Sequence, residues 1–176
     1  SDFESQGWPG NGNLSNPYVI GGLTIDTDDI CISISNTNVY FEIRNCTLVS
    51  APAGADAAIR LSNVDHANLT RVLVQGGMYG LYAVDCRMCY VNDSLFVGYA
   101  RTGIRFERVT LGHIENTTVS LMDSSGVHFD DCDNCTVLNC DITNNDITGI
   151  HASDSSDLTV AHCDVSSNGW TGILFR

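Results

Sequence analysis

The chain has 176 residues, enough for one domain with a continuous core. Its net charge is −13, all eight of its basic residues are Arg, and it contains no Lys. A surface of this sign repels polyanions and anionic bilayers, and no run of about 18 apolar residues occurs, so we expect neither nucleic-acid binding nor membrane insertion.

Residues 1–24 are predicted to form an N-terminal cap and a first strand. Pro9 and Pro17 cannot donate hydrogen bonds to a strand ladder, and Trp8 is large enough to cover the open end of a core. The strand is expected at Tyr18-Val19-Ile20.

From residue 25 to residue 176 the sequence is organised in repeats of about 23 residues. Five short phrases open with glycine at this interval and continue with alternating apolar residues, as in Gly103-Ile104-Arg105-Phe106. An apolar period of two predicts short strands with one buried face, and the Asn, Asp, Ser and Gly clusters between them predict turns. The five glycines are Gly80, Gly103, Gly126, Gly149 and Gly172.

Other columns keep the same interval, among them Val91, Ile114, Val137 and Val160. Short strands that repeat in this way, with no helical stripe between them, stack as successive coils of a solenoid. We therefore predict an all-β chain that forms a single-stranded right-handed parallel β-helix of about six to seven coils. Residues one repeat apart then lie about 4.8 Å from each other, on neighbouring strands.

The earlier coils fit this scheme with small adjustments. Ala58-Ile59-Arg60-Leu61 precedes the equivalent Gly80-Leu81-Tyr82-Ala83 by 22 residues, so that coil is one residue shorter. Ile30-Cys31-Ile32 lies further back, and residues 51–56 are expected to form a loop that lengthens its coil.

The two ends of the chain bear on whether a signal peptide or further coils belong to the protein. Ser1-Asp2-Phe3-Glu4 is not a basic and apolar leader, so any signal peptide lies outside this chain. The last residues, Leu174-Phe175-Arg176, stop midway through a phrase with no C-terminal cap. We expect either a fragment of a longer protein or end-to-end association with another subunit through this coil.

These phrases resemble the parallel β-helix repeats of the NosD-like family, also called the CASH (carbohydrate-binding and sugar-hydrolase) domain. The segment from Gly10-Asn11-Gly12-Asn13 to Pro17-Tyr18-Val19-Ile20 is similar to the first motif of such proteins. The resemblance implies an archaeal or bacterial surface protein, located extracellularly, on the cell surface or in the periplasm. It departs from the family at the position of the stacked asparagines, which is occupied here by Cys46, Ser94, Thr117, Cys140 and Cys163.

Eight cysteines fit an oxidising compartment if they pair. Two C-x-x-C motifs occur, Cys86-Arg87-Met88-Cys89 and Cys132-Asp133-Asn134-Cys135. They lie two coils apart, about 9–10 Å, too far for one tetrahedral zinc ion. Local disulfides and buried turn thiols both stay open, and Cys140 and Cys163 are expected to stack as core thiols.

The most promising functional candidates point outward from the strands that follow the glycines. Two imidazoles one strand apart beside a carboxylate suit either a divalent metal ion or acid–base chemistry. The alternative is a solvated face with cross-strand ion pairs. The candidate catalytic residues are Arg105, Glu107, His128, Asp130 and His151.

A divalent cation, calcium or copper, is the only cofactor expected. Its candidate ligands include Asp141 and Asp164, which stand one repeat apart on another outward column, besides His128, His151 and Asp130. An ordinary exposed pair of carboxylates is the favoured interpretation of Asp141 and Asp164.

Three functions follow from these observations. The first is a non-catalytic extracellular module that acts as a scaffold or binds a glycan, a metal ion or a partner protein. The second is a polysaccharide lyase or glycoside hydrolase, and the third is a structural stalk within a larger surface protein. The sequence favours a protein without enzymatic activity but does not establish this.

Overall fold

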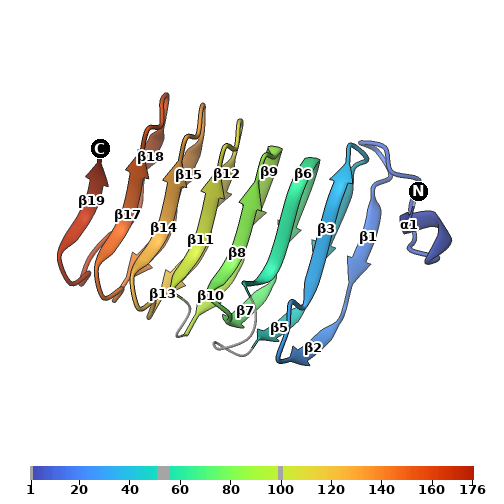
Figure 1. Ribbon diagram of the computed structural model, residues 1–176, viewed down its shortest axis with the longest axis horizontal. Coiled ribbons are helices and arrows are strands. Elements are labelled where there is room, and N and C mark those ends of the chain that lie inside the picture. The colour runs from blue at the N-terminus through green and yellow to red at the C-terminus, as the bar shows by residue number, and fades with distance from the viewer. Residues whose placement is uncertain (1, 51–55, 99–100) are drawn as a thin grey trace.

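The computed structural model shows the predicted right-handed parallel β-helix, with about seven turns spaced about 23 residues apart (Figure 1). It describes residues 2–50, 56–98 and 101–176. Most of the loop predicted at residues 51–56 therefore lies outside the described residues. The strands form three faces that run along the whole stack.

The first face carries the glycine phrases. Its strands pair in parallel, each with the equivalent strand of the next coil. They are β3 (Ile32–Thr37), the first half of β6 (Ala57–Thr70), β8 (Tyr79–Val84), β11 (Thr102–Glu107), β14 (Ser125–Asp130), β17 (Thr148–Ser153) and β19 (Thr171–Phe175).

The second face joins the first through β6, which pairs with β3 and β8 in its first half and with β4 and β9 in its second half. Its other strands are β1 (Tyr18–Gly21), β4 (Phe41–Arg44), β9 (Arg87–Asn92), β12 (His113–Glu115), β15 (Thr136–Leu138) and β18 (Thr159–Ala161).

The third face is a separate sheet of six strands. They are β2 (Thr24–Thr27), β5 (Thr47–Ser50), β7 (Leu73–Gly76), β10 (Leu95–Val97), β13 (Thr118–Ser120) and β16 (Asp141–Thr143). Because the three faces enclose one interior, every second side chain of a strand is buried in a shared core.

The register confirms the alignment of residues 23 apart. Ile104 lies opposite Val127, and Phe106 opposite Phe129, with the two phenyl rings 5.8 Å apart in an edge-to-face contact. The predicted shorter coil is present, since Ile59 lies opposite Leu81, 22 residues away.

The glycine column is required by close packing. A Cβ atom added to Gly126 would lie 2.5 Å from Cγ2 of Ile142 and 2.8 Å from the backbone oxygen of Gly149. Gly103 and Gly149 meet the equivalent obstacles from Val119 and Val165. Only a residue without a side chain fits where the first face approaches the inward side chains of the third.

Asparagine and aspartate are abundant because the turns use left-handed backbone conformations. Asn45, Asn116 and Asn139 have φ values of 52°, 47° and 50° in equivalent turns, and Asp93 has 49°. Their short polar side chains tolerate this region better than most residues do.

Stacked asparagine side chains do occur, but not at the position where the NosD-like family has them. Asn145 is buried and donates from Nδ2 to Oδ1 of Asn168 at 2.9 Å, while its own Oδ1 accepts from the backbone of Met122. In the column of Cys46 and Cys140, Ser94 and Thr117 instead use their hydroxyl groups to accept backbone N–H groups of the preceding coil.

All eight cysteines are free thiols. Burial raises the pKa of Cys86 to about 11 and that of Cys140 to about 12, so both stay protonated at neutral pH. Six of the eight are buried, namely Cys46, Cys86, Cys89, Cys132, Cys135 and Cys140. The buried cysteines therefore act as small core residues.

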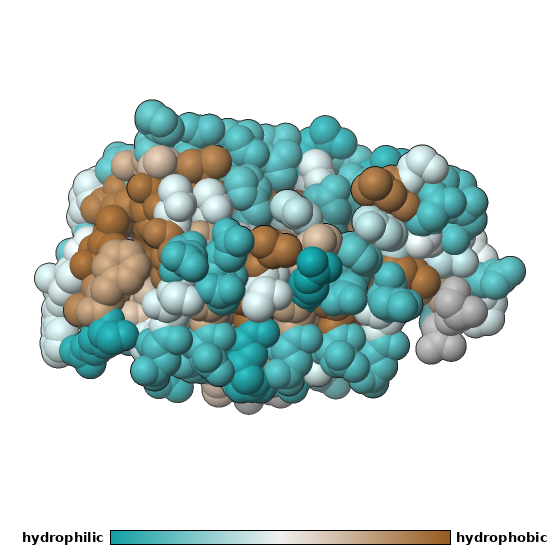
Figure 2. Space-filling view, turned by 90° about the horizontal axis from the view of Figure 1, so that it is seen from above, coloured by the Kyte–Doolittle hydropathy of each residue, from teal (hydrophilic) through white to brown (hydrophobic). Residues whose placement is uncertain are grey.

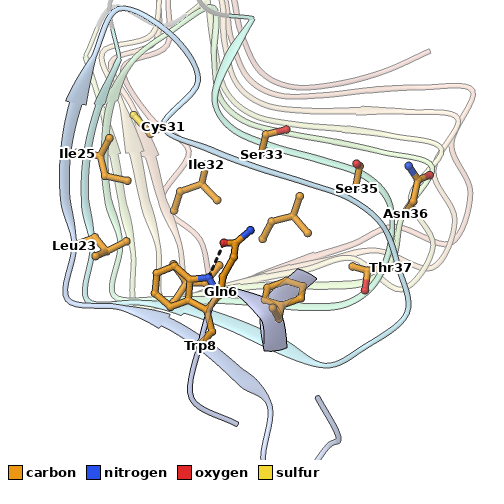
Figure 3. Close-up of a pocket in the computed structure, with 13 residues that line it drawn as sticks. Gln6, Trp8, Leu23, Ile25, Cys31, Ile32, Ser33, Ser35, Asn36 and Thr37 are labelled. Carbon is orange, nitrogen blue, oxygen red and sulfur yellow. Dashed lines mark hydrogen bonds between the residues drawn. The ribbon is translucent and has the colours of Figure 1, made fainter. Parts of the chain in front are cut away.

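The N-terminal end is partly closed by residues 2–10. Helix α1 (Asp2–Ser5) brings Phe3 onto the ring of Tyr18, 5.2 Å away, and Trp8 donates a hydrogen bond to Gln6 (Figure 3). A cavity of about 540 Å³ remains between this cap and β3, lined mainly by apolar side chains such as Leu23 and Ile25.

The last coil exposes apolar side chains at the C-terminal end, where Figure 2 shows hydrophobic surface. Ile173 is 41% exposed and Phe175 57%, although the equivalent Ile150 and Ala152 of the coil before are buried. Within the described residues no helix is long and apolar enough to cross a bilayer.

Candidate functional site

The structure brings the five predicted catalytic candidates together on the first face. Arg105 lies opposite His128, which lies opposite His151, and Glu107 lies opposite Asp130. All five side chains point outward and are partly exposed. We call these five residues the Arg105 cluster.

Arg105 is the centre of this cluster. Its Nη2 donates to Oδ2 of Asp130 at 2.6 Å and to Oε2 of Glu107 at 3.1 Å. Its guanidinium carbon also lies 5.7 Å from the centre of the Tyr79 ring. The cation therefore sits between the two carboxylates, where a metal ion would otherwise have to bind.

The hydrogen bonds fix the protonation of His128. A guanidinium can only donate, so Nδ1 of His128 accepts from Nη1 of Arg105 at 3.1 Å and the ring proton lies on Nε2. Nε2 points to Oγ of Ser153, which donates to Oδ1 of Asp130. The donors and acceptors form a closed ring.

Burial, supported by the charge of Arg105 and the neighbouring ring of His151, lowers the pKa of His128 to about 4. The rings of His128 and His151 are stacked, with centroids 4.4 Å apart and planes inclined by 15°. Burial also lowers the pKa of His151, whose Nε2 is buried without a hydrogen-bond partner among the described residues. Both imidazoles are neutral at pH 7.

Burial alone would raise the pKa of Glu107, but hydrogen bonds from Tyr82, Arg108 and Arg105 outweigh this effect and lower it. Burial and the hydrogen bond to Glu107 in turn raise the pKa of Tyr82 to about 12. Glu107 is therefore ionised at neutral pH. A glycoside hydrolase needs one protonated carboxylic acid, and Glu107 does not provide it.

Metal binding by the candidate histidine and aspartate ligands stays a prediction. Because the rings of His128 and His151 are stacked, their in-plane lone pairs lie in nearly parallel planes and do not converge on one metal ion. Asp141, the first residue of β16 on the third face, lies opposite Asp164 in an isolated bridge, and both are exposed. Among the described residues no three His, Cys, Asp or Glu side chains are placed to hold a metal ion.

A second site, which the sequence did not predict, lies on the second face. It is a surface groove of about 320 Å³ that crosses β4, β6, β9 and β12, and Leu14 and Pro17 of the N-terminal loop form its rim. We call it the aromatic groove. The loop is held in place by a hydrogen bond from the backbone of Tyr40 to the carbonyl of Gly12.

Gly10 and Gly12 explain the glycine-rich motif that precedes the groove. A Cβ atom on Gly10 would overlap the carbonyl of Pro17, and one on Gly12 would lie 2.7 Å from the ring of Tyr18. Both residues also have positive φ values, 117° and 75°. The motif therefore packs the rim of the groove against the first coils.

Rings of four successive coils line the groove. Tyr40 and His66 are stacked with their centroids 3.9 Å apart, and Tyr90 and His113 lie 5.9 Å apart on neighbouring strands. Tyr90 is 42% exposed although it belongs to a regular strand. Exposed rings of this kind offer flat apolar surfaces beside polar groups.

Each of these rings is followed two residues later on its own coil by a carboxylate or amide group. Glu42, Asn68, Tyr90 and His113 form one outward column, because each lies opposite the next. Asn92 lies opposite Glu115 in the adjacent column. Oε2 of Glu115 lies 3.3 Å from Nε2 of His113.

A signal for part of this groove is present in the sequence. Tyr90 and Asn92 flank the buried Val91, and 23 residues later His113 and Glu115 flank Ile114. The Tyr40–His66 contact carries no such signal, because these two residues are 26 positions apart and the interval is set by the irregular early coils.

Comparisons with known proteins agree with the fold. Residues 57–176 match the family model described as "Right handed beta helix region". No curated protein matches the sequence.

Two solved structures are similar. The crystal structure of an alginate lyase from Paenibacillus sp. str. FPU-7 has a TM-score of 0.51 and 14% identity, and the match covers 90% of this chain but 65% of that one. A putative glycosyl hydrolase from Parabacteroides merdae ATCC 43184 has a TM-score of 0.29 and 12% identity, with 89% and 81% covered. At this identity the likeness to the lyase shows a shared fold, and this chain spans less than two thirds of the lyase's length.

Proposed function

This chain belongs to the right-handed β-helix family, and from that premise we propose that it is a non-catalytic module that binds a glycan in the aromatic groove. The proposal places it outside the cytoplasm, on the cell surface or in the periplasm, in keeping with the NosD-like resemblance. The observation that carries it is the groove itself, where each of four successive coils contributes an aromatic or imidazole ring and, two residues later, a carboxylate or amide group.

The groove suits a sugar for two reasons. The C–H face of a pyranose ring packs on an aromatic ring such as Tyr90, whose apolar surface is otherwise open to water. The hydroxyl groups find donors and acceptors in Asn68, Asn92 and Glu115. The coils repeat about every 4.8 Å, a spacing close to one sugar unit of an extended chain.

The same groove is poorly suited to hydrolysis. Glu42 on β4 and Glu115 on β12 are separated by three strand spacings, about 14 Å, because β6 and β9 lie between their strands. The two carboxyl groups of a glycoside hydrolase lie at most about 9.5 Å apart. Binding without turnover is therefore the function that this geometry supports best.

A glycan array probed with the 176-residue chain tests the proposal. We expect binding to a defined set of oligosaccharides that Tyr90→Ala reduces at least tenfold, without release of reducing ends or unsaturated products. Tyr79→Ala, which removes a ring from the first face, is the matched control and should bind normally. Equal loss in both variants, or no binding by the unmodified chain, would contradict the proposal.

A lyase at the Arg105 cluster is the second candidate function. His128 is neutral and close to a guanidinium, the pairing that abstraction of a proton beside a substrate carboxylate requires. The substrate would have to displace Glu107 and Asp130 from Arg105. Formation of unsaturated products from a polyuronate such as alginate, abolished by His128→Ala, would establish this activity in place of the first proposal.

Binding of a divalent cation is a further proposal, either at Asp141 and Asp164 or at His128, His151 and Asp130. Titration with calcium and with copper, followed by calorimetry, tests it. Binding that disappears in Asp141→Asn or in His151→Ala would identify which of the two places holds the ion.

A further inference from the structure

We infer that the aromatic groove selects glycans that carry free amino groups over neutral or acidic glycans of the same length. This inference rests on the proposed function, because it names the class of ligand for the same groove.

The charged groups that line the groove are acidic. Glu42 and Glu115 line it, whereas no Arg contributes to its described lining. Glu42 has a cationic partner outside the groove, since Nη1 of Arg44 lies 3.3 Å from its Oε2. Among the residues that the structure describes, Glu115 has the imidazole of His113 as its side-chain partner, and its side chain is 36% exposed. The carboxylate of Glu115 is therefore the group available to a cation.

Tyr90 and Glu115 flank the position that an ammonium group would occupy. His113 lies opposite Tyr90 and two residues before Glu115, so all three side chains point outward from neighbouring strands. An ammonium placed beside His113 meets the face of the Tyr90 ring on one side and the carboxylate of Glu115 on the other. Attraction to the ring and to the carboxylate at such a partly exposed site strengthens binding by about tenfold.

The charge of the whole chain acts in the same direction. A net charge of −13 without any Lys attracts polycations and repels polyanions over roughly a Debye length, about 8 Å at physiological salt. Acidic glycans such as oligouronates would have to approach both this surface and the carboxylates of the groove. The preferred ligand is thus an oligosaccharide of deacetylated amino sugars.

Calorimetry with three oligosaccharides of equal length tests the inference: an N-acetylated chito-oligosaccharide, its deacetylated form at a pH that keeps it protonated, and an alginate oligomer. We expect the deacetylated form to bind about tenfold more tightly than the acetylated one, the alginate oligomer to show no binding, and the preference to shrink in high salt.

Two variants separate the groove from the overall charge. Glu115→Gln should abolish the preference for the amino sugar while it leaves affinity for the acetylated form within about twofold. Asp141→Asn removes the same charge from β16 on the third face and should keep the preference. Tyr90→Ala should weaken binding of both forms.

The outcomes distinguish this inference from the proposed function. Equal affinity for the two chito-oligosaccharides, a preference that survives Glu115→Gln, or tighter binding of the alginate oligomer overturns the inference and leaves glycan binding intact. Amino-sugar binding that Tyr90→Ala does not change overturns the inference too, because the ligand then sits elsewhere. Failure of every glycan, in this test and on the array, overturns the proposed function itself.

Discussion

Arg105 joins side chains from three successive coils of the first face. Its guanidinium bonds to Glu107 on its own strand and to Asp130 on the next, and it lies near Tyr79 on the strand before. Its side chain is 18% exposed, so the two carboxylates depend on it more than exposed ion pairs do. The cation is therefore a structural element of this face.

Replacement of Arg105 by Met should destabilise the fold by about 1–3 kcal/mol, because Asp130 is left beside the carboxylate of Glu107 without the cation between them, although Glu107 keeps its ion pair with Arg108. Urea denaturation measures this free energy of unfolding. Glu107→Gln combined with Asp130→Asn should restore most of the loss in the Arg105→Met background. Arg87→Met, at an exposed position, is the control and should change stability little; an equal loss there would refute the assigned role.

The stability of the fold should also depend on pH through His128. Its pKa in the folded state, about 4, is below the ordinary value of 6.5, so between these values the unfolded chain binds more protons. The contribution is complete above pH 6.5 and is lost as the pH falls toward 4. With allowance for solvent screening, we expect the free energy of unfolding to fall by about 1–2 kcal/mol between pH 7 and pH 5.

Urea denaturation at several pH values checks this dependence. His128→Asn should flatten the profile between pH 7 and pH 5, and the remaining slope should come from His151, whose pKa is lowered as well. A profile identical to that of the unmodified chain would show that His128 titrates normally.

The sequence predicted the membership of the Arg105 cluster and gave cross-strand ion pairs as one alternative, but it did not predict which groups bond to Arg105. A constant repeat makes Arg105, His128 and His151 neighbours whatever their side chains do. Whether Arg105 binds carboxylates or leaves room for a metal ion depends on side-chain conformations that periodicity does not specify. Parts of the aromatic groove were missed because the contact between Tyr40 and His66 crosses coils of unequal length.

The strand-opening glycines act at the level of the element. The sequence identified the column from its interval, and the structure supplies the reason, which is that a Cβ atom would meet the inward side chains of the third face. The last glycine of the column, Gly172, is less crowded, since its nearest obstacle is the oxygen of Val165 at 3.3 Å. The same substitution should therefore have different effects along one column.

Gly126→Ala should destabilise the chain by about 1–3 kcal/mol, because Ile142 and the backbone of Gly149 must shift. Gly172→Ala should cost clearly less. Thermal unfolding followed by circular dichroism compares the two variants. Equal effects at both positions would mean that the close approach seen at Gly126 does not limit stability.

The whole molecule is a stack whose two ends differ. Phe3 and Trp8 partly cover the N-terminal end, while Ile173 and Phe175 are exposed on the last coil. An uncovered strand edge beside apolar side chains favours association. The stalk function predicted from the sequence would use the same feature, because further coils or a second subunit would bury this surface.

The 176-residue polypeptide should therefore associate end to end at micromolar to millimolar concentration. Sedimentation velocity measures this, and Phe175→Glu should return the chain to a monomer. Leu121→Glu, at a turn residue that is 53% exposed, is the control and should leave association unchanged. A monomer at all concentrations would contradict this prediction without affecting the account of the groove.

The proposed function depends on which face of the stack binds the glycan. Titration of the isotopically labelled chain with the tightest-binding oligosaccharide from the array, followed by amide chemical shifts, measures this directly. We predict that the shifts change in β4, β9, β12 and the second half of β6, with the largest effects near Tyr90 and Glu115. Changes confined to β11, β14 and β17 around Arg105 would contradict the assignment of the aromatic groove and favour the lyase instead.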